Sequence, residues 1–184
     1  MPFFIFQLNY FLLKYVIMGK ILVFPSGKLI WKNKEYRCAL GKSGVSKNKI
    51  EGSKTTPEGC FSLREVFFRP DKIKNLETTL PAKMLNPADG WCDDPKDKNY
   101  NKFVKLPYPA SAENLWREDY LYDIIVVLGY NDDPVIPGKG SAIFMHIARE
   151  SYSPTDGCIA LALPDLLKIL KTVNKKTLIC IKNK

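Results

Sequence analysis

The sequence predicts a single domain that is mainly β-structure, with one or two short helices. At 184 residues, the chain is long enough to bury one hydrophobic core and too short for two comfortable ones. Short apolar and aromatic runs, separated by Pro, Gly, Asn and Ser, recur along most of its length. Hydrophobic residues make up 46% of the chain and no segment is repetitive, which argues against a disordered or repeat protein.

Strands are expected first at 20–26, 27–33 and 35–41, which form a hairpin or meander. The Pro-Ser-Gly sequence at 25–27 supplies the first turn. A loop rich in Gly, Ser and Lys follows. The next strand is indicated by Pro57 and Gly59, which precede alternating apolar residues: Phe61, Leu63, Val66 and Phe67.

The rest of the chain reads as a long loop, two strands, a helix and a last strand. Residues 71–116 are polar and dotted with Pro, Gly and Asn, and a loop of this length inside a domain is often functional. The apolar segment 121–131 predicts a strand buried on both faces, and 138–148 predicts the next. Pro164 suits the first turn of a helix whose apolar residues are Leu166, Leu167, Leu170 and Val173. Residues 177–182 predict the closing strand.

The formal net charge of +9 comes from lysines that are spread along the chain rather than gathered in one block. Such a surface is compatible with nucleic acid, with an anionic cell-wall polymer or with a membrane surface, and a lysine-rich composition also explains it without any partner. No nucleic-acid recognition motif is present, so we expect no nucleic-acid partner. We expect a monomer.

Five cysteines lack the paired spacing of a metal site, and the chain has one histidine. We therefore expect no structural metal and no cofactor. Cys38 and Cys180 lie in apolar runs, where a buried and inert thiol is the usual outcome. A disulfide is compatible with the sequence, but no spacing in it supports one.

The first 18 residues are apolar but interrupted by Gln7, Asn9 and Lys14, with no clear signal-peptide cleavage site. Two interpretations stay open: a mis-assigned start or loosely attached segment, and a weak export or membrane-surface segment. We therefore place the domain at residues 19–184.

Two residues are candidates for a catalytic nucleophile and its base. His146 is the only histidine, and Cys158 follows it by twelve positions. A cysteine nucleophile needs a base and donors for the developing oxyanion, and the amides of Gly157 and Cys158 are candidate donors. On spacing alone, a buried histidine and a small apolar cysteine are the favoured interpretation, because a Cys/His pair without a family signature is a weak signal.

Two motifs resemble those of the L,D-transpeptidase (YkuD-type) catalytic domain. His146 followed by SPTDGCI at 153–159 resembles the family's active-site signature, in which Ser or Thr, a variable residue often His, and Gly precede the nucleophilic Cys. The sequence TTPEGCF at 55–61 resembles its upstream TPxGxF element. The resemblance extends from Lys20 to Lys182.

The resemblance implies a β-sandwich with one or two short helices and a cysteine acyltransferase of the bacterial cell envelope. Cys158 would attack the bond before the terminal D-Ala of a peptidoglycan stem peptide, with His146 as base. An amine acceptor would resolve the thioester and give a 3-3 cross-link. Water as acceptor would make an L,D-carboxypeptidase, and loss of turnover would leave a peptidoglycan-binding module.

The sequence departs from the family at two positions beside the nucleophile. The frequent second histidine is Asp156, and the arginine usually found two places after the cysteine is Ala160. Arg149 is a candidate to replace that arginine. A backbone carbonyl often orients the base in this family, whereas Asp156 is a candidate orienting group or turn cap.

The remaining candidates for substrate binding lie in two loops. Ser153 and Thr155 are polar side chains near the nucleophile, and they either bind substrate or shape the turn. In the long polar segment a lid or a self-packed surface loop is expected from Trp91, Asp93, Asp94, Tyr100, Asn101 and Trp116.

Overall fold

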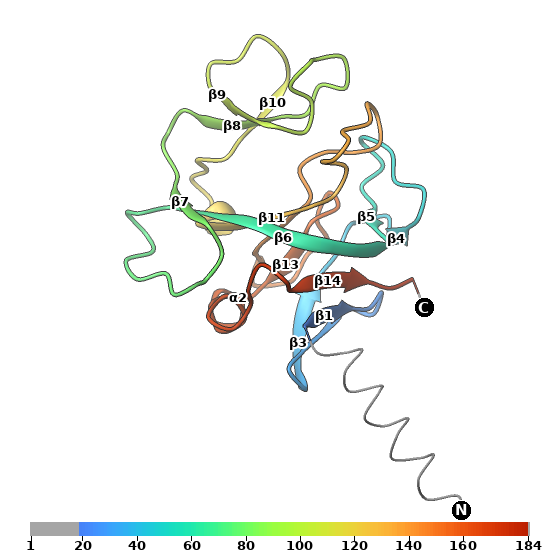
Figure 1. Ribbon diagram of the computed structural model, residues 1–184, viewed down its shortest axis with the longest axis vertical. Helices are drawn as coiled ribbons and strands as arrows, with labels where there is room; N and C mark the ends of the chain where they lie inside the picture. The colour runs from blue at the N-terminus through green and yellow to red at the C-terminus, as the bar shows by residue number, and fades with distance from the viewer. Residues whose placement is uncertain (1–18, 184) are drawn as a thin grey trace, which may run out of the picture.

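The computed structural model describes residues 19–183 (Figure 1). The segment 1–18, and with it the expectation of export or membrane contact, lies outside the described residues. No helix within 19–183 is long and apolar enough to cross a membrane.

A nine-stranded sheet forms the body of the molecule and confirms the prediction of a mainly β fold. Its strands are β1 Lys20–Val23, β2 Lys28–Trp31, β3 Lys34–Ala39, β6 Gly59–Phe68, β7 Ala82–Met84, β11 Ile124–Leu128, β12 Phe144–Ile147, β13 Ile159–Leu161 and β14 Leu178–Ile181. They pair in the order β11-β12-β13-β3-β2-β1-β14-β6-β7, and β11 also pairs with β6. The sheet therefore closes on itself, and its two halves face each other across the core.

Burial along the strands explains why these runs pair. In β1 the burial alternates, with Ile21 and Val23 fully buried, as expected of a strand with one face on the core. All five residues of β11 are buried because the main core lies on one face and a second apolar cluster on the other. β11 runs antiparallel to β6, with which it pairs from Ile124↔Phe68 to Leu128↔Leu63.

The α-helix α2 (Leu163–Leu170) packs on the main core near its predicted position. Pro164 lies in its first turn, as expected. The buried stripe is Leu166, Ile169 and Leu170, while Leu167 is only partly buried. A 3-10 turn, η1 (Tyr120–Tyr122), is the second short helical element.

The long polar segment is not a plain loop, which corrects the expectation for 71–116. Besides β7 it contains β8 (Asp89–Cys92), β9 (Phe103–Lys105) and β10 (Ala112–Asn114), which form a separate sheet in the order β10-β8-β9. This small sheet lies at the top of Figure 1, apart from the main sheet. Two further short strands, β4 (Val45–Ser46) and β5 (Thr56–Pro57), pair with each other.

A disulfide joins Cys60 to Cys180, which corrects the expectation that Cys180 is a free thiol. The two residues are direct partners in the antiparallel pair β6–β14. The free cysteines of the described chain are Cys38, Cys92 and Cys158, and all three are buried.

Candidate active site

Two neighbouring parallel strands bring the lone histidine and Cys158 to one cavity. His146 on β12 pairs with Ala160 on β13, and Cys158 precedes Ala160 by two residues. Because alternate residues of a strand point to the same face, all three side chains face the same way. They line a cavity of about 490 Å³.

The turn before Cys158 is held by Thr155. Its hydroxyl donates to the Cys158 carbonyl at 2.7 Å and accepts the Gly157 amide at 3.2 Å. Gly157 has φ 136°, and a Cβ there would approach the Thr55 carbonyl oxygen to 2.8 Å, so glycine is required. Asp156 instead faces outward and pairs with Lys54 at 3.4 Å.

A buried lysine lies beneath this turn. Lys49 is 5% exposed, and its ammonium donates to the Thr55 carbonyl at 3.0 Å. The same Nζ would lie 3.1 Å from a Cβ placed on Gly157. Burial lowers the pKa of Lys49, and the nearby Glu51 and Cys158 oppose that shift. The upstream TTPEG element and the nucleophile turn therefore meet around one cation.

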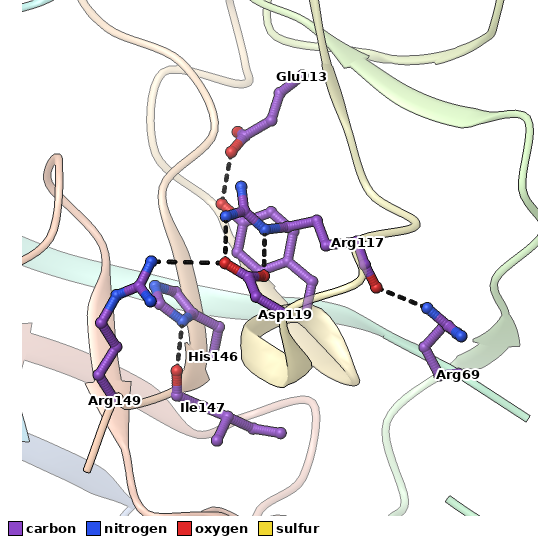
Figure 2. Close-up of polar contacts among 8 residues, drawn as sticks. Arg69, Glu113, Arg117, Asp119, His146, Ile147 and Arg149 are labelled. Carbon is purple, nitrogen blue, oxygen red and sulfur yellow. Dashed lines mark hydrogen bonds and ion pairs between the residues drawn. The ribbon is translucent and has the colours of Figure 1, made fainter. Parts of the chain in front are cut away.

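The imidazole of His146 is held in one tautomer by a backbone carbonyl. Its Nδ1 lies 2.8 Å from the Ile147 oxygen (Figure 2), and because a carbonyl only accepts, Nδ1 carries the proton. Nε2 is then the basic nitrogen. Burial lowers the pKa of His146 to about 4, despite the hydrogen bond to Ile147, so the ring is neutral near pH 7.

Cys158 is 8% exposed as a residue. Two backbone groups form hydrogen bonds with its sulfur. Sγ donates to the Ala142 carbonyl at 3.2 Å and accepts the Phe144 amide at 3.4 Å. Neither partner is the imidazole. Burial, together with the charge of Glu113, raises the pKa of the thiol to about 12. At rest the site thus holds a neutral thiol and a neutral imidazole, and not an ion pair.

A chain of charged and aromatic side chains forms the wall next to His146 (Figure 2). The Tyr122 ring meets the imidazole edge-on at 5.2 Å between centroids, and its hydroxyl donates to Glu113 at 2.7 Å. Arg117 lies over the same ring and makes two hydrogen bonds to Asp119, at 2.7 and 2.6 Å. Arg149 reaches the same carboxylate more loosely, at 3.4 Å.

The predicted site residues divide into those that line the cavity and those that do not. Lining it, besides His146 and Cys158, are Asp93, Arg149, Ser153, Thr155 and Asp156. Trp91 and Tyr100 lie behind its wall. The Trp91 indole donates to Asn101 at 2.9 Å and packs on Phe144, and the Tyr100 hydroxyl donates to Glu51.

Sequence reasoning missed several cavity residues that carry charge or hydrogen bonds: Glu51, Lys54, Glu113, Arg117 and Tyr122. It also missed Lys49. Glu113 enters the cavity only because β10 pairs with β8, a strand that its sequence does not reveal. Within residues 19–183, no group of three or more His, Cys, Asp or Glu side chains is placed to hold a metal ion.

Comparison with known proteins identifies a family and two solved structures of low sequence identity. The chain matches the L,D-transpeptidase catalytic domain over residues 18–181, whereas no curated protein matches it. An L,D-transpeptidase from Mycobacterium smegmatis is 12% identical with a TM-score of 0.43, covering 89% of this chain and 58% of its own. The helical cell shape determining protein Pgp2 from Campylobacter jejuni is 17% identical with a TM-score of 0.45, covering 90% and 47%.

The chain therefore spans 47–58% of the length of these two solved structures. The match to the family itself covers nearly the whole described domain. By that match, this protein belongs to the L,D-transpeptidase catalytic domain (YkuD) family.

Proposed function

We propose that this protein is a cysteine acyltransferase that cleaves the bond before the terminal D-Ala of peptidoglycan stem tetrapeptides. The observation that carries the proposal is the cavity shared by Cys158 and His146, with Nδ1 tied to the Ile147 carbonyl. That hydrogen bond leaves Nε2 as a base on the same cavity. Membership of the family supports the substrate class.

Acylation begins from the neutral pair. The thiol hydrogen turns from the Ala142 carbonyl toward Nε2 of His146, which takes the proton as sulfur attacks the peptide carbonyl. Because the thiol pKa is about 12, little thiolate exists beforehand, so proton transfer accompanies attack. The amide of Cys158 is the proposed oxyanion donor. The Gly157 amide joins it by sharing the hydrogen that it directs to Thr155.

Collapse of the tetrahedral intermediate breaks the carbon–nitrogen bond, and the imidazolium gives its proton to the departing amine of D-Ala. The thioester on Cys158 is then attacked by an acceptor amine, whose proton passes to His146. Collapse returns that proton to sulfur. With a stem-peptide amine the product is a 3-3 cross-link, and with water it is a shortened stem peptide.

Arg149 is the proposed partner for a substrate carboxylate. In the family pattern an arginine stands two places after the cysteine, but here Ala160 occupies that place beside His146. Arg149 lines the cavity with a half-exposed side chain and one loose contact to Asp119, so most of its donors are open to a ligand. Ser153 and Thr155 line the same cavity.

The proposed location is the cell envelope, where peptidoglycan is assembled. The Cys60–Cys180 disulfide supports this placement because such bonds persist in oxidising compartments. Stem peptides are the proposed partners of a monomeric enzyme.

The proposal is tested by intact-mass analysis of the protein incubated with a stem tetrapeptide. Wild-type protein should gain the mass of the acyl group on Cys158, and Cys158→Ala should gain none while keeping its unfolding midpoint. A carbapenem should likewise label Cys158 and leave the buried thiols Cys38 and Cys92 unmodified.

Turnover by the Cys158→Ala variant, or labelling at another cysteine, would refute the nucleophile. Muropeptide analysis of the products separates cross-linking from hydrolysis. Peptide binding without any thioester would instead identify a non-catalytic peptidoglycan-binding module.

A further inference from the structure

One buried side chain, that of Asn101, links the small sheet to the segment that contacts the nucleophile. Its amide nitrogen donates to the carbonyls of Tyr130 and Asn131, at 3.0 and 2.7 Å. Its amide oxygen accepts the Trp91 indole at 2.9 Å and the Ala142 backbone amide at 3.0 Å. A side-chain amide has two donor hydrogens and two acceptor lone pairs, so all of its hydrogen-bonding capacity is used. The orientation of the group is fixed, because a flipped amide would turn its nitrogen toward two donors.

The residue that Asn101 holds has a backbone conformation that alanine rarely adopts. Ala142 has φ 50°, in the left-handed region that costs free energy for residues with a Cβ. The chain is anchored on both sides of it. The Gly140 amide before it donates to a tyrosine hydroxyl at 3.0 Å, and the Ile143 carbonyl after it accepts an amide of β11 at 3.2 Å. The hydrogen bond to Asn101 therefore stabilises a conformation that the flanking anchors require and that alanine alone disfavours.

In that conformation the Ala142 carbonyl contacts the nucleophile. The Cys158 thiol donates to this oxygen at 3.2 Å, and the sulfur accepts the Phe144 amide at 3.4 Å. A hydrogen bond donated by the thiol favours its protonated form, because the same carbonyl oxygen would repel a negative sulfur. The bond also fixes where the sulfur lies in the cavity that His146 shares. The Ala142 carbonyl thus contributes to both the position and the protonation of the resting sulfur.

We propose that Asn101 is a positioning residue for the nucleophile, and that it acts by holding Ala142 in the left-handed conformation. The inference rests on the proposed function, since it takes Cys158 as the nucleophile. Asn101 lies outside the cavity lining, and its effect passes through the amide and the carbonyl of one residue. The resting thiol stays protonated and in place, and it reacts when His146 takes its proton.

The experiment removes the side chain and then relieves the backbone. Asn101→Gly deletes all four hydrogen bonds, and glycine tolerates the φ of 57° at this position. Ala142→Gly removes the cost of the left-handed conformation, so the double variant should regain what Asn101→Gly loses. Asn99→Gly is the matched control. Asn99 also lies between β8 and β9, but its side chain donates to Tyr108 and lies outside the cavity lining.

Two reactions of Cys158 are measured at one pH. Alkylation by iodoacetamide reports the thiolate without any substrate, and peptide mass analysis separates it from alkylation of Cys38 and Cys92. Thioester formation with a stem tetrapeptide reports the alignment of the sulfur for attack. Cys92 reports any loosening of the small sheet, because its carbonyl accepts the Asn101 backbone amide at 2.9 Å.

Cys158 in Asn101→Gly should be alkylated roughly fivefold faster than in wild type, because the thiol loses a hydrogen bond that favours its protonated form. Its thioester should form roughly tenfold more slowly, because the sulfur is less well aligned. Cys38 and Cys92 should react as in wild type. The double variant should recover most of both rates, and Asn99→Gly should behave as wild type.

Rates at Cys158 that stay at the wild-type level in Asn101→Gly would overturn the inference. A change that Ala142→Gly does not reverse, or faster alkylation of Cys92 as well, would also overturn it, since either indicates general loosening. If Asn101→Gly does not fold, hydrogen exchange of the Ala142 amide in wild type decides by NMR: protection supports the hydrogen bond, and unprotected exchange refutes it. Absence of a thioester in every protein would refute the proposed function, while the alkylation rates would still test the inference.

Discussion

The pKa of His146, the only histidine, tests how far the imidazole is shielded from water. Burial depresses the pKa of His146 from 6.5 to about 4, so the folded protein resists a proton that the unfolded chain accepts. A shift of that size corresponds to about 3 kcal/mol in the free energy of unfolding. Stability contributed this way is intact above pH 6.5 and is lost as the pH falls toward 4. Between pH 7 and pH 5 the loss is about 2 kcal/mol.

The perturbation is His146→Asn, whose amide can still donate to the Ile147 carbonyl but does not titrate. Urea unfolding at pH 7 and pH 5 gives the free energy of unfolding for both proteins. Wild type should lose about 2 kcal/mol more than the variant between these two values, because carboxylates titrate similarly in both. Taking the difference between the two pH values removes the pH-independent effect of the substitution on the free energy of unfolding.

Since the chain has one histidine, its ring protons give a single NMR titration with no assignment problem. An imidazole that titrates near 6.5, or equal pH losses for wild type and His146→Asn, would refute the reasoning. Either outcome would mean that water or a nearby carboxylate stabilises the charged ring.

Two further predictions concern the framework of the site. Lys49→Met should slow thioester formation on Cys158 roughly tenfold, because the buried cation favours the thiolate that develops during attack. Lys49→Arg should recover part of the rate. Equal rates in all three proteins would show that Lys49 takes no part in the mechanism. Replacing Cys60 and Cys180 by serine removes a cross-link between residues separated by 120 positions. The free energy of unfolding in urea should fall by about 2–5 kcal/mol, while Cys158 is still acylated at 25 °C. An unchanged free energy of unfolding would argue against the disulfide.

The sequence predicted the strands whose residues meet the core, because burial imposes a pattern on them. The apolar runs of β11 and β1 predict strands, and the structure has strands at both places. The sequence pattern does not predict the strands β8, β9 and β10, because they are only three or four residues long and contain Asp, Gly, Lys and Asn. Their pairing is stabilised by contacts between segments far apart in the chain, which no local pattern records.

The same division explains the candidate site. Cys158 and His146 belong to a local signature, so a resemblance identified them. Glu113 and Lys49 became visible only through tertiary structure. By sequence Asp156 is a candidate orienting group or turn cap, yet in the structure it pairs with Lys54, and the Ile147 carbonyl holds the ring.

The pairing of β6 with β11 sets where the domain tolerates change. Phe68, the last residue of β6, is the direct partner of Ile124, the first residue of β11, and the Arg69 amide donates to the Asp123 carbonyl at 2.9 Å. The residues between them include β7, which returns to pair with β6, and the separate sheet of β8, β9 and β10. Homologous replacement of that whole excursion should leave the register of β12 and β13 undisturbed. The proposed nucleophile and base, Cys158 and His146, therefore lie outside the stretch of sequence that would be exchanged.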